Sequence, residues 1–314
     1  MDRRRSSARL SGYVKLNVRF DMDRYKLMTD RLRWDDLDMD GFATERLAEE
    51  ELRCLRYAHD VEYHTACYLR DLLSTRAHDE SRMTAFLTFW AWEEFWHGEA
   101  IATVLRAHGE AAGDDRINPL RRRLGLRNRL GPAIWSLASL ALKDLPAVHM
   151  TWGAVNEWTT QAAYARISAR AGHPVLTELL SRIMKQEGRH IDFYASEANL
   201  RLDRSRTARA LTRFALRRAW TPVGAGVLPD AEVAFVVQYL FDNPEGHAMV
   251  ARIDRRIDRL PDQEGLGLLA NALATWRAKA AQLQLPGSTG ANRSQRMADE
   301  SERTHRTRSV PHAA

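Results

Sequence analysis

One spacing of glutamate and histidine occurs twice in this chain and restricts what the chain can fold into. The stretches EEFWHG and QEGRHI each contain Glu-x-x-His, at Glu94–His97 and at Glu187–His190. On an α-helix, side chains three positions apart lie on one face with their Cβ atoms ~5–6 Å apart, so both can reach the same bound ion. A single pair of this kind is common by chance. Two pairs are informative if both face inward from separate helices.

Helical periodicity dominates the chain from Thr44 onward. Apolar residues recur at steps of three and four through segments rich in Ala, Leu, Glu and Arg, which predicts helices. The four longest predicted helices span 44–76, 80–109, 146–171 and 174–201. Shorter ones are predicted at 205–219, 229–242, 245–260 and 262–285, with another near 133–143 inside a connection at 110–145. No convincing strand pattern is present, so the sequence predicts an all-α protein.

The same pattern suggests how the chain is divided. Residues 1–40 are charged and weakly periodic, which predicts an N-terminal arm. Residues 41–285 are predicted to form a single helical domain, with a core at 44–201 and further helices at 205–285. The segment 286–314 is rich in Ser, Arg and Thr and is predicted to be a disordered tail.

Both Glu-x-x-His pairs occupy positions where a core residue would be expected. In the segments 80–109 and 174–201 they continue a stripe of apolar residues, and each of the other two long segments has one glutamate at mid-stripe, Glu62 and Glu157. A buried carboxylate or imidazole is costly unless it is paired or bound to a metal. In chain order the set is Glu, Glu-x-x-His, Glu, Glu-x-x-His, which is the ligand inventory of a two-metal carboxylate site inside a four-helix bundle.

The donor atoms indicate which metals suit such a site. Four carboxylates balance the charge of two divalent cations, and each imidazole adds one nitrogen ligand. A mixed oxygen and nitrogen set favours iron or manganese over a metal that prefers thiolates. We therefore expect two iron ions, with manganese as the alternative, and coordination positions left open for O2.

These motifs resemble those of the soluble acyl-ACP desaturases, a family of the ferritin-like di-iron superfamily. EEFWHG is similar to the family's EE-x-x-HG motif, and QEGRH to its DE-x-R-H motif. The resemblance covers roughly residues 30–265. It implies an all-α fold with a ferritin-like four-helix bundle core and additional helices N- and C-terminal to it.

The resemblance also implies roles for individual residues. Glu62 and Glu157 correspond to terminal metal ligands, Glu94 and Glu187 to bridging carboxylates, and His97 and His190 to nitrogen ligands. Thr160, three positions after Glu157, corresponds to a threonine beside the O2 site.

The chain departs from the family at two positions. Gln186 stands where the family has an acid, and Trp96 stands where it has an arginine. Both belong to the layer of residues around the metal ligands, where a substitution can alter reactivity and leave metal binding intact. Trp34 resembles an N-terminal tryptophan that the family links to this layer.

The reaction implied by the resemblance is an O2-dependent desaturation. Two hydrogens would be removed from neighbouring carbons of an acyl chain carried on acyl carrier protein, with electrons from a ferredoxin-type donor. An apolar channel is required, for which we expect walls from Met150, Trp152, Thr160 and Phe193. Two alternatives remain: a di-iron N-oxygenase or hydroxylase of a small molecule, and a non-catalytic ferritin-like metal-binding protein.

Composition bears on compartment and partners. Two cysteines and no apolar stretch behind the first arginines predict a reduced, cytoplasmic protein without a secretory signal. No segment reaches the ~18 apolar residues of a membrane span. The net charge of +6 favours acidic partners such as acyl carrier protein, and no nucleic-acid-binding motif is present. The family resemblance implies a homodimer formed through the first and second long helices.

Overall fold

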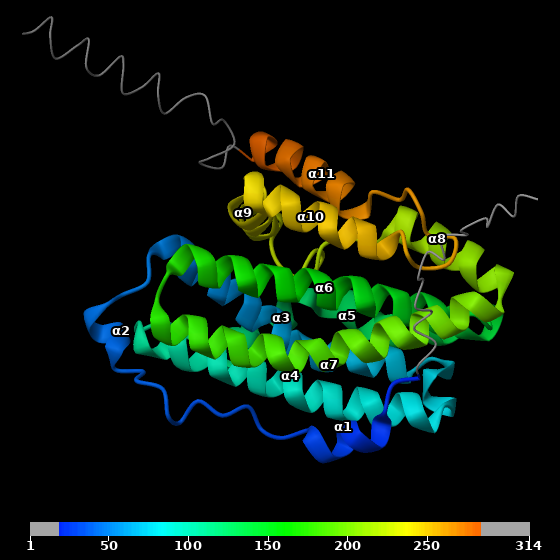
Figure 1. Ribbon diagram of the computed structural model, residues 1–314, viewed down its shortest axis with the longest axis horizontal. Coiled ribbons are helices and arrows are strands. Elements are labelled where there is room, and N and C mark those ends of the chain that lie inside the picture. The colour runs from blue at the N-terminus through cyan, green and yellow to red at the C-terminus, as the bar shows by residue number, and fades with distance from the viewer. Residues whose placement is uncertain (1–18, 284–314) are drawn as a thin grey trace, which may run out of the picture.

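The computed structural model describes residues 19–283, which form eleven α-helices and one 3-10 helix, with no strand in that range. The predicted tail at 286–314 and the first part of the predicted arm lie outside the described residues. The α-helices, labelled in Figure 1, are α1 (Met22–Met28), α2 (Gly41–Thr44), α3 (Glu49–Leu73), α4 (Ser81–Ala107), α5 (Asp114–Ala141), α6 (Leu145–Ala171), α7 (Pro174–Arg204), α8 (Arg206–Ala219), α9 (Asp230–Phe241), α10 (Pro244–Ile257) and α11 (Leu268–Gln282). The 3-10 helix η1 (Arg76–Asp79) joins α3 to α4. The prediction of an all-α protein is confirmed for the described residues.

The helix boundaries follow local chemistry. Pro174 and Pro244 stand in the first turns of α7 and α10, where the missing N–H is not needed. Gly172, with φ at 60°, ends α6 in the left-handed conformation that favours glycine. The predicted helix at 262–285 begins only at Leu268, because the preceding loop contains further positive-φ residues.

The prediction for the connection at 110–145 was wrong. The structure has a long helix there, α5, which is interrupted only at Gly125, where φ is 50° and ψ is −133°. Two prolines, Pro119 and Pro132, are accommodated within it. The short helix expected near 133–143 is therefore the second half of a longer element.

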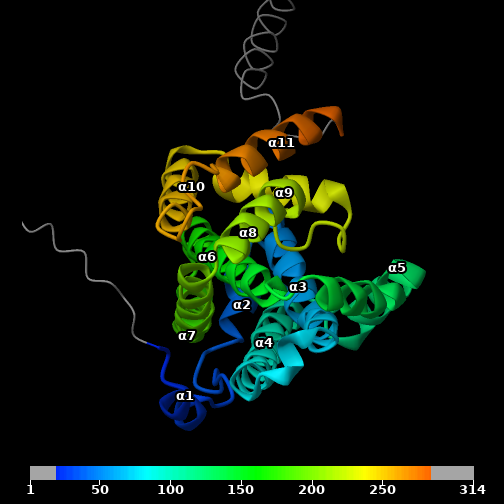
Figure 2. The same ribbon diagram turned by 90° about the vertical axis from the view of Figure 1, so that its right-hand side faces the viewer.

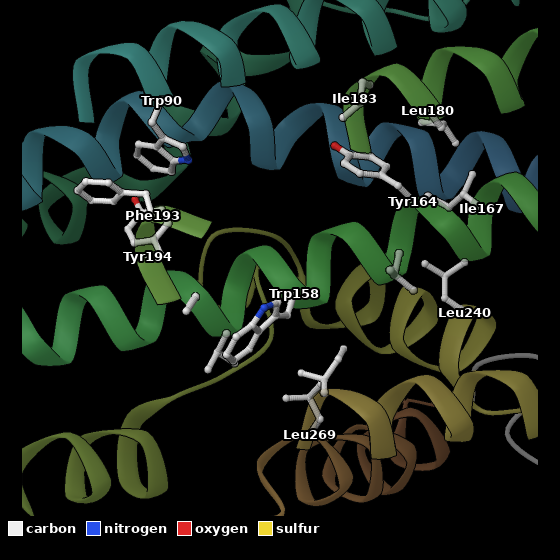
Figure 3. Packing of buried hydrophobic residues seen from close by; sticks show 14 of the residues in the cluster. Trp90, Trp158, Tyr164, Ile167, Leu180, Ile183, Phe193, Tyr194, Leu240 and Leu269 are labelled. Carbon is white, nitrogen blue, oxygen red and sulfur yellow. The ribbon is translucent and has the colours of Figure 1, made fainter. Parts of the chain in front are cut away.

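The four long helices α3, α4, α6 and α7 lie side by side and enclose the core (Figures 1 and 2). The closest pairings are α3 with α4 and α6 with α7. The remaining helices after α7 cover one side: α8, α9 and α10 contact α6, and α11 lies on α9 and α10. Two faces of α6 are thus buried. Figure 3 shows Trp90 and Tyr194 on its inner side, while Trp158 and Leu269 lie on the side of the covering helices.

None of the described helices has a sufficiently long apolar stretch to cross a bilayer.

Candidate metal centre

The structure brings all six predicted ligand residues together at mid-height of the four long helices. All six are buried. They form two clusters in which one ligand atom from each residue lies within 4.8 Å of the others. The first cluster contains Glu62, Glu94, His97 and Glu187, and the second contains Glu94, Glu157, Glu187 and His190. Because Glu94 and Glu187 belong to both clusters, the geometry is that of two adjacent positions joined by two carboxylates.

Each histidine points the same ring nitrogen at the shared carboxylates. His97 Nδ1 lies 3.1 Å from Glu94 Oε2 and 3.4 Å from Glu187 Oε1. His190 Nδ1 lies 3.1 Å from Glu94 Oε1 and 3.0 Å from Glu187 Oε2. Both imidazoles therefore face the space between the clusters, and they do so from two neighbouring helices, α4 and α7.

The outer nitrogen of each ring has an acceptor. His97 Nε2 lies 2.9 Å from Gln186 Oε1, and His190 Nε2 lies 2.8 Å from Glu93 Oε2. An acceptor at Nε2 favours the tautomer that carries its proton there and leaves the Nδ1 lone pair directed inward. Both histidines are thus oriented as metal ligands are in proteins.

The surroundings of the two histidines differ in charge. On the His190 side, Glu93 also accepts hydrogen bonds from the Tyr25 hydroxyl, at 2.8 Å, and from Arg189. On the His97 side, the neutral Gln186 donates to the carbonyl oxygen of Asp30 at 3.2 Å. A carboxylate therefore supports one imidazole and an amide supports the other.

An aromatic layer closes the His97 side. The Trp34 and Trp96 rings lie 6.1 Å apart, and the Arg31 guanidinium lies over both. Trp34 therefore lies next to Trp96, one of the two residues at which the sequence departs from the motifs it resembles. The N-terminal segment covers both sides of the centre, because Tyr25 lies against the other histidine's partner.

The carboxylates are held from outside as well. Trp90 Nε1 donates to Glu157 Oε1 at 3.0 Å, and the Tyr164 hydroxyl donates to Glu62. Glu187 Oε1, by contrast, is buried and has no well-formed hydrogen bond among the described residues, since the His97 Nδ1 atom lies 3.4 Å away. A buried oxygen without a partner is costly. A cation between the clusters would satisfy it.

Without a cation the site needs protons to balance its charge. Burial, followed by repulsion from Glu94, raises the pKa of Glu62 well above its usual value, and burial together with the charge of Glu187 does the same for Glu157. Burial alone would lower the pKa of His97, but the adjacent carboxylates of Glu187 and Glu94 outweigh it and raise that pKa to about 9. Burial would also lower the pKa of His190, but the neighbouring Tyr25 hydroxyl and hydrogen bonds to nearby carboxylates raise it well above its usual value.

The two shared carboxylates shift in the opposite direction. Burial would raise the pKa of Glu94, yet hydrogen bonding to Glu62 and the positive charge of His190 hold it well below the usual value. The pKa of Glu187 is lowered in the same way by both histidines. The metal-free site is therefore neutral when two glutamic acids and two imidazoliums carry protons, and two divalent cations could replace those protons. The residues present fit a pair of such ions.

A cavity of about 220 Å³ reaches the centre from one side. Its walls include the carboxylates of all four ligand glutamates. The loop 221–227 covers it, and aromatic side chains of Tyr68, Trp90 and Trp152 contribute much of the remaining surface. Of the residues expected to line a channel, Trp152 and Thr160 do so, whereas Met150 and Phe193 are buried elsewhere. Phe193 stacks on Phe86, with centroids 3.6 Å apart.

The cavity also has polar walls and a smaller neighbour. His64, Thr65 and Asn156 line it, and burial beside Arg121 lowers the pKa of His64 to about 4, so this ring is neutral near pH 7. A second cavity of about 70 Å³ lies between α3, α6 and α9, and Thr160 lines both cavities.

Several residues of the site were not predicted from the sequence. These are the hydrogen-bonding partners of the ligands: Tyr25, Glu93, Trp90, Tyr164 and Arg189. A signal existed for two of them, since Glu93 directly precedes one ligand and Arg189 directly precedes another.

Comparison of the chain with protein-family models, with curated proteins and with solved structures finds no match in any of the three. The interpretation of the centre therefore depends on its residues and their geometry.

Proposed function

We propose that α3, α4, α6 and α7 form a ferritin-like four-helix bundle that holds two metal ions, and that the protein is a di-iron, O2-dependent oxidoreductase. The observation that carries this proposal is the pair of buried clusters joined by Glu94 and Glu187. Four carboxylates and two imidazoles match iron or manganese in both charge and donor type. Two iron ions held there would supply oxidation of a substrate C–H bond by O2.

The chain's own residues would prepare the site for that chemistry. Glu62 and Glu157 would each hold one ion, and Trp90 and the Tyr164 hydroxyl would orient these two carboxylates. The covering loop at 221–227 would keep bulk water away from the cavity. Thr160, which lines the cavity one turn after Glu157, would be positioned beside the reacting carbon.

An acyl chain is the substrate that the cavities support best. The smaller cavity shares Glu62 and Thr160 with the larger one and is lined mainly by apolar groups, including Ile167, Val236 and Leu240. A flexible hydrocarbon could pass the carboxylates and end there. We therefore propose desaturation of an acyl chain delivered by acyl carrier protein, with electrons from a ferredoxin-type donor; the chain's net charge of +6 favours such an acidic carrier.

A second candidate function rests on a specific observation. The larger cavity is below the ~300 Å³ at which typical small-molecule sites begin, and it presents His64, Thr65 and Asn156 to its contents. Those features suit a compact polar substrate, as expected for an N-oxygenase or hydroxylase. A non-catalytic metal-binding protein is supported less well, because such a protein does not need a cavity that reaches the carboxylates.

Product analysis of reconstituted protein distinguishes these functions. The full chain is loaded anaerobically with ferrous iron, its metal content is counted, and acyl-ACPs of several lengths are added with ferredoxin, its reductase and O2. Mass spectrometry is expected to show loss of two hydrogen atoms from the acyl group. Gain of one oxygen atom would favour the second candidate. Protein that holds two ions but changes no acyl-ACP would contradict desaturation.

A further inference from the structure

The second half of α5 carries an apolar face that points into solvent. Five large side chains on it keep 54–72% of their surface exposed: Leu126, Leu130, Ile134, Leu137 and Leu140. Between residues 130 and 142 the sequence contains no charged residue. Figure 2 shows α5 projecting beside α3, away from the covering helices. Its contacts in the described structure are mainly with α3 and η1.

The opposite face of this helix is polar and is the one that packs on the protein. Pro132 cannot donate to the carbonyl oxygen of Asn128, and the Arg70 guanidinium donates to that oxygen instead, at 2.8 Å. Ser74 Oγ donates to the carbonyl of Pro132 at 3.1 Å, and Ser136 Oγ donates to the carbonyl of Ser74 at 2.6 Å. Surface helices normally bury their apolar stripe. Here the polar contacts fix the helix with its apolar stripe outward.

The spacing of the exposed residues is that of a helix pair. Leu126, Leu130, Ala133, Leu137 and Leu140 follow one another at intervals of four, three, four and three. This is the repeat of the seam between two coiled helices. The order is also nearly palindromic about Ala133, whose small side chain is exposed. An antiparallel copy would place Leu126 opposite Leu140 and Leu130 opposite Leu137.

We propose that this face is the contact between two copies of the chain, formed by antiparallel pairing of the second half of α5 about a two-fold axis near Ala133. The five large side chains expose on the order of 600 Å², near the upper limit for an ordinary surface patch and close to the ~800 Å² that each partner contributes to a stable interface. The rim of the contact would supply the difference. This site differs from the α3–α4 contact expected from the family resemblance.

The polar face of the helix distinguishes a second copy from a lipid surface. A helix that lies on a lipid surface needs a wider apolar face, with cations on the polar face behind it. The face behind this stripe is instead occupied by neutral Asn128, Ser136 and Ser139, which contact the end of α3 and η1.

The mass of the full chain in solution tests the proposal. Sedimentation velocity at tens of micromolar is expected to give twice the 35.9 kDa of one chain. Leu137→Glu is expected to give a monomer with an unchanged circular dichroism spectrum, because substitution of an exposed side chain hardly changes folding stability. The matched control is Phe214→Glu, which alters an exposed apolar residue on α8 and is expected to remain dimeric.

Cross-linking tests the orientation without relying on a disruptive change. Leu126→Cys and Leu140→Cys chains are expected to form a disulfide-linked dimer when mixed and oxidised, and neither is expected to do so alone. A monomeric wild-type chain, or a Leu137→Glu chain that stays dimeric, would overturn the proposal. A wild-type monomer that floats with vesicles containing anionic lipid, with flotation lost in Leu137→Glu, would overturn it in favour of a lipid surface.

Discussion

At the scale of single residues, the centre is organised around Glu94 and Glu187, because each contributes to both clusters. The other four ligand residues each belong to one. Removal of a shared carboxylate should therefore change the metal content differently from removal of a ligand that belongs to one cluster. This difference separates a two-ion centre from two independent binding positions.

We predict that Glu187→Gln lowers the metal content of reconstituted protein from two ions per chain to less than one. His97→Ala should retain one ion, held by Glu157 and His190 with the shared carboxylates. Metal analysis after removal of loosely bound ions measures both outcomes. Glu178→Gln, an exposed change on the same helix, is the control and should bind two. Two tightly held ions in Glu187→Gln would contradict the arrangement.

The unequal partners of the two histidines lead to a second prediction. Glu93→Gln removes the charge that supports His190, and a change in such a partner typically weakens metal affinity 10–100-fold. We expect about tenfold weaker binding of one ion, with the other unchanged. Gln186→Glu supplies a carboxylate to His97 and should tighten the other ion. Competition with a chelator measures both affinities. Equal effects of Glu93→Gln on the two ions would show that the partners do not act separately.

The sequence could predict the six ligand residues because an acid or a histidine stands out on an apolar stripe. It could not predict Tyr164 or Trp90 as their partners. Both looked like ordinary core residues, and which hydrogen bonds they make depends on how far each helix is rotated about its axis. That rotation is set by packing among all four long helices, which no local pattern contains.

At the scale of the helices, a glycine lets α3 and α4 approach each other closely in the core. Gly98, directly after His97 on α4, faces α3, and a Cβ atom at this position would lie 2.7 Å from Tyr63 Cδ2. Gly188, directly after Glu187 on α7, has no such neighbour within 4 Å. Each glycine directly follows a predicted metal ligand, but the surroundings of the two differ.

This pair gives a matched stability test. Gly98→Ala should lower the free energy of unfolding by about 1–3 kcal/mol, because the added methyl group overfills a packed contact. Gly188→Ala should raise it by about 0.5–1 kcal/mol, because alanine is favoured over glycine inside a helix. Chemical denaturation of metal-free protein measures both values. Equal effects would mean that α3 and α4 are not held as closely as the structure shows.

The long helices were predictable to within a few residues, and α5 was not. Uninterrupted periodicity and terminal Gly or Pro residues mark α4, α6 and α7 clearly. The segment of α5 contains the residues that usually indicate a loop, namely Gly125, Pro119 and Pro132. The helix persists because contacts with α3 replace a hydrogen bond that Pro132 cannot make, and such compensation is invisible before the helices are placed.

At the scale of the whole molecule, folding and metal binding are linked through protons. Folding collects four carboxyl groups and two imidazoles in one buried volume, and burial with mutual repulsion raises the pKa values of Glu62 and Glu157. The pKa of His97 rises from 6.5 to about 9. Metal ligands must be deprotonated, so two ions would displace roughly four protons from these residues and His190.

The raised pKa values determine how folding stability depends on pH. A group with a raised folded-state pKa stabilises the fold fully below its unfolded pKa, and this contribution is lost as pH rises through the folded value. For His97 the window runs from 6.5 to about 9. Metal-free protein should therefore lose part of its stability across this range, while protein loaded with Mn²⁺ should not, since its ligands have already released their protons. The rise in Tm on adding Mn²⁺ should grow from pH 6.5 to 9, measured by calorimetry at fixed free metal concentration.

His97→Ala should flatten this trend, whereas Glu178→Gln should leave it intact. A metal-induced rise in Tm that shrinks with increasing pH would mean that the ion does not displace protons from this site.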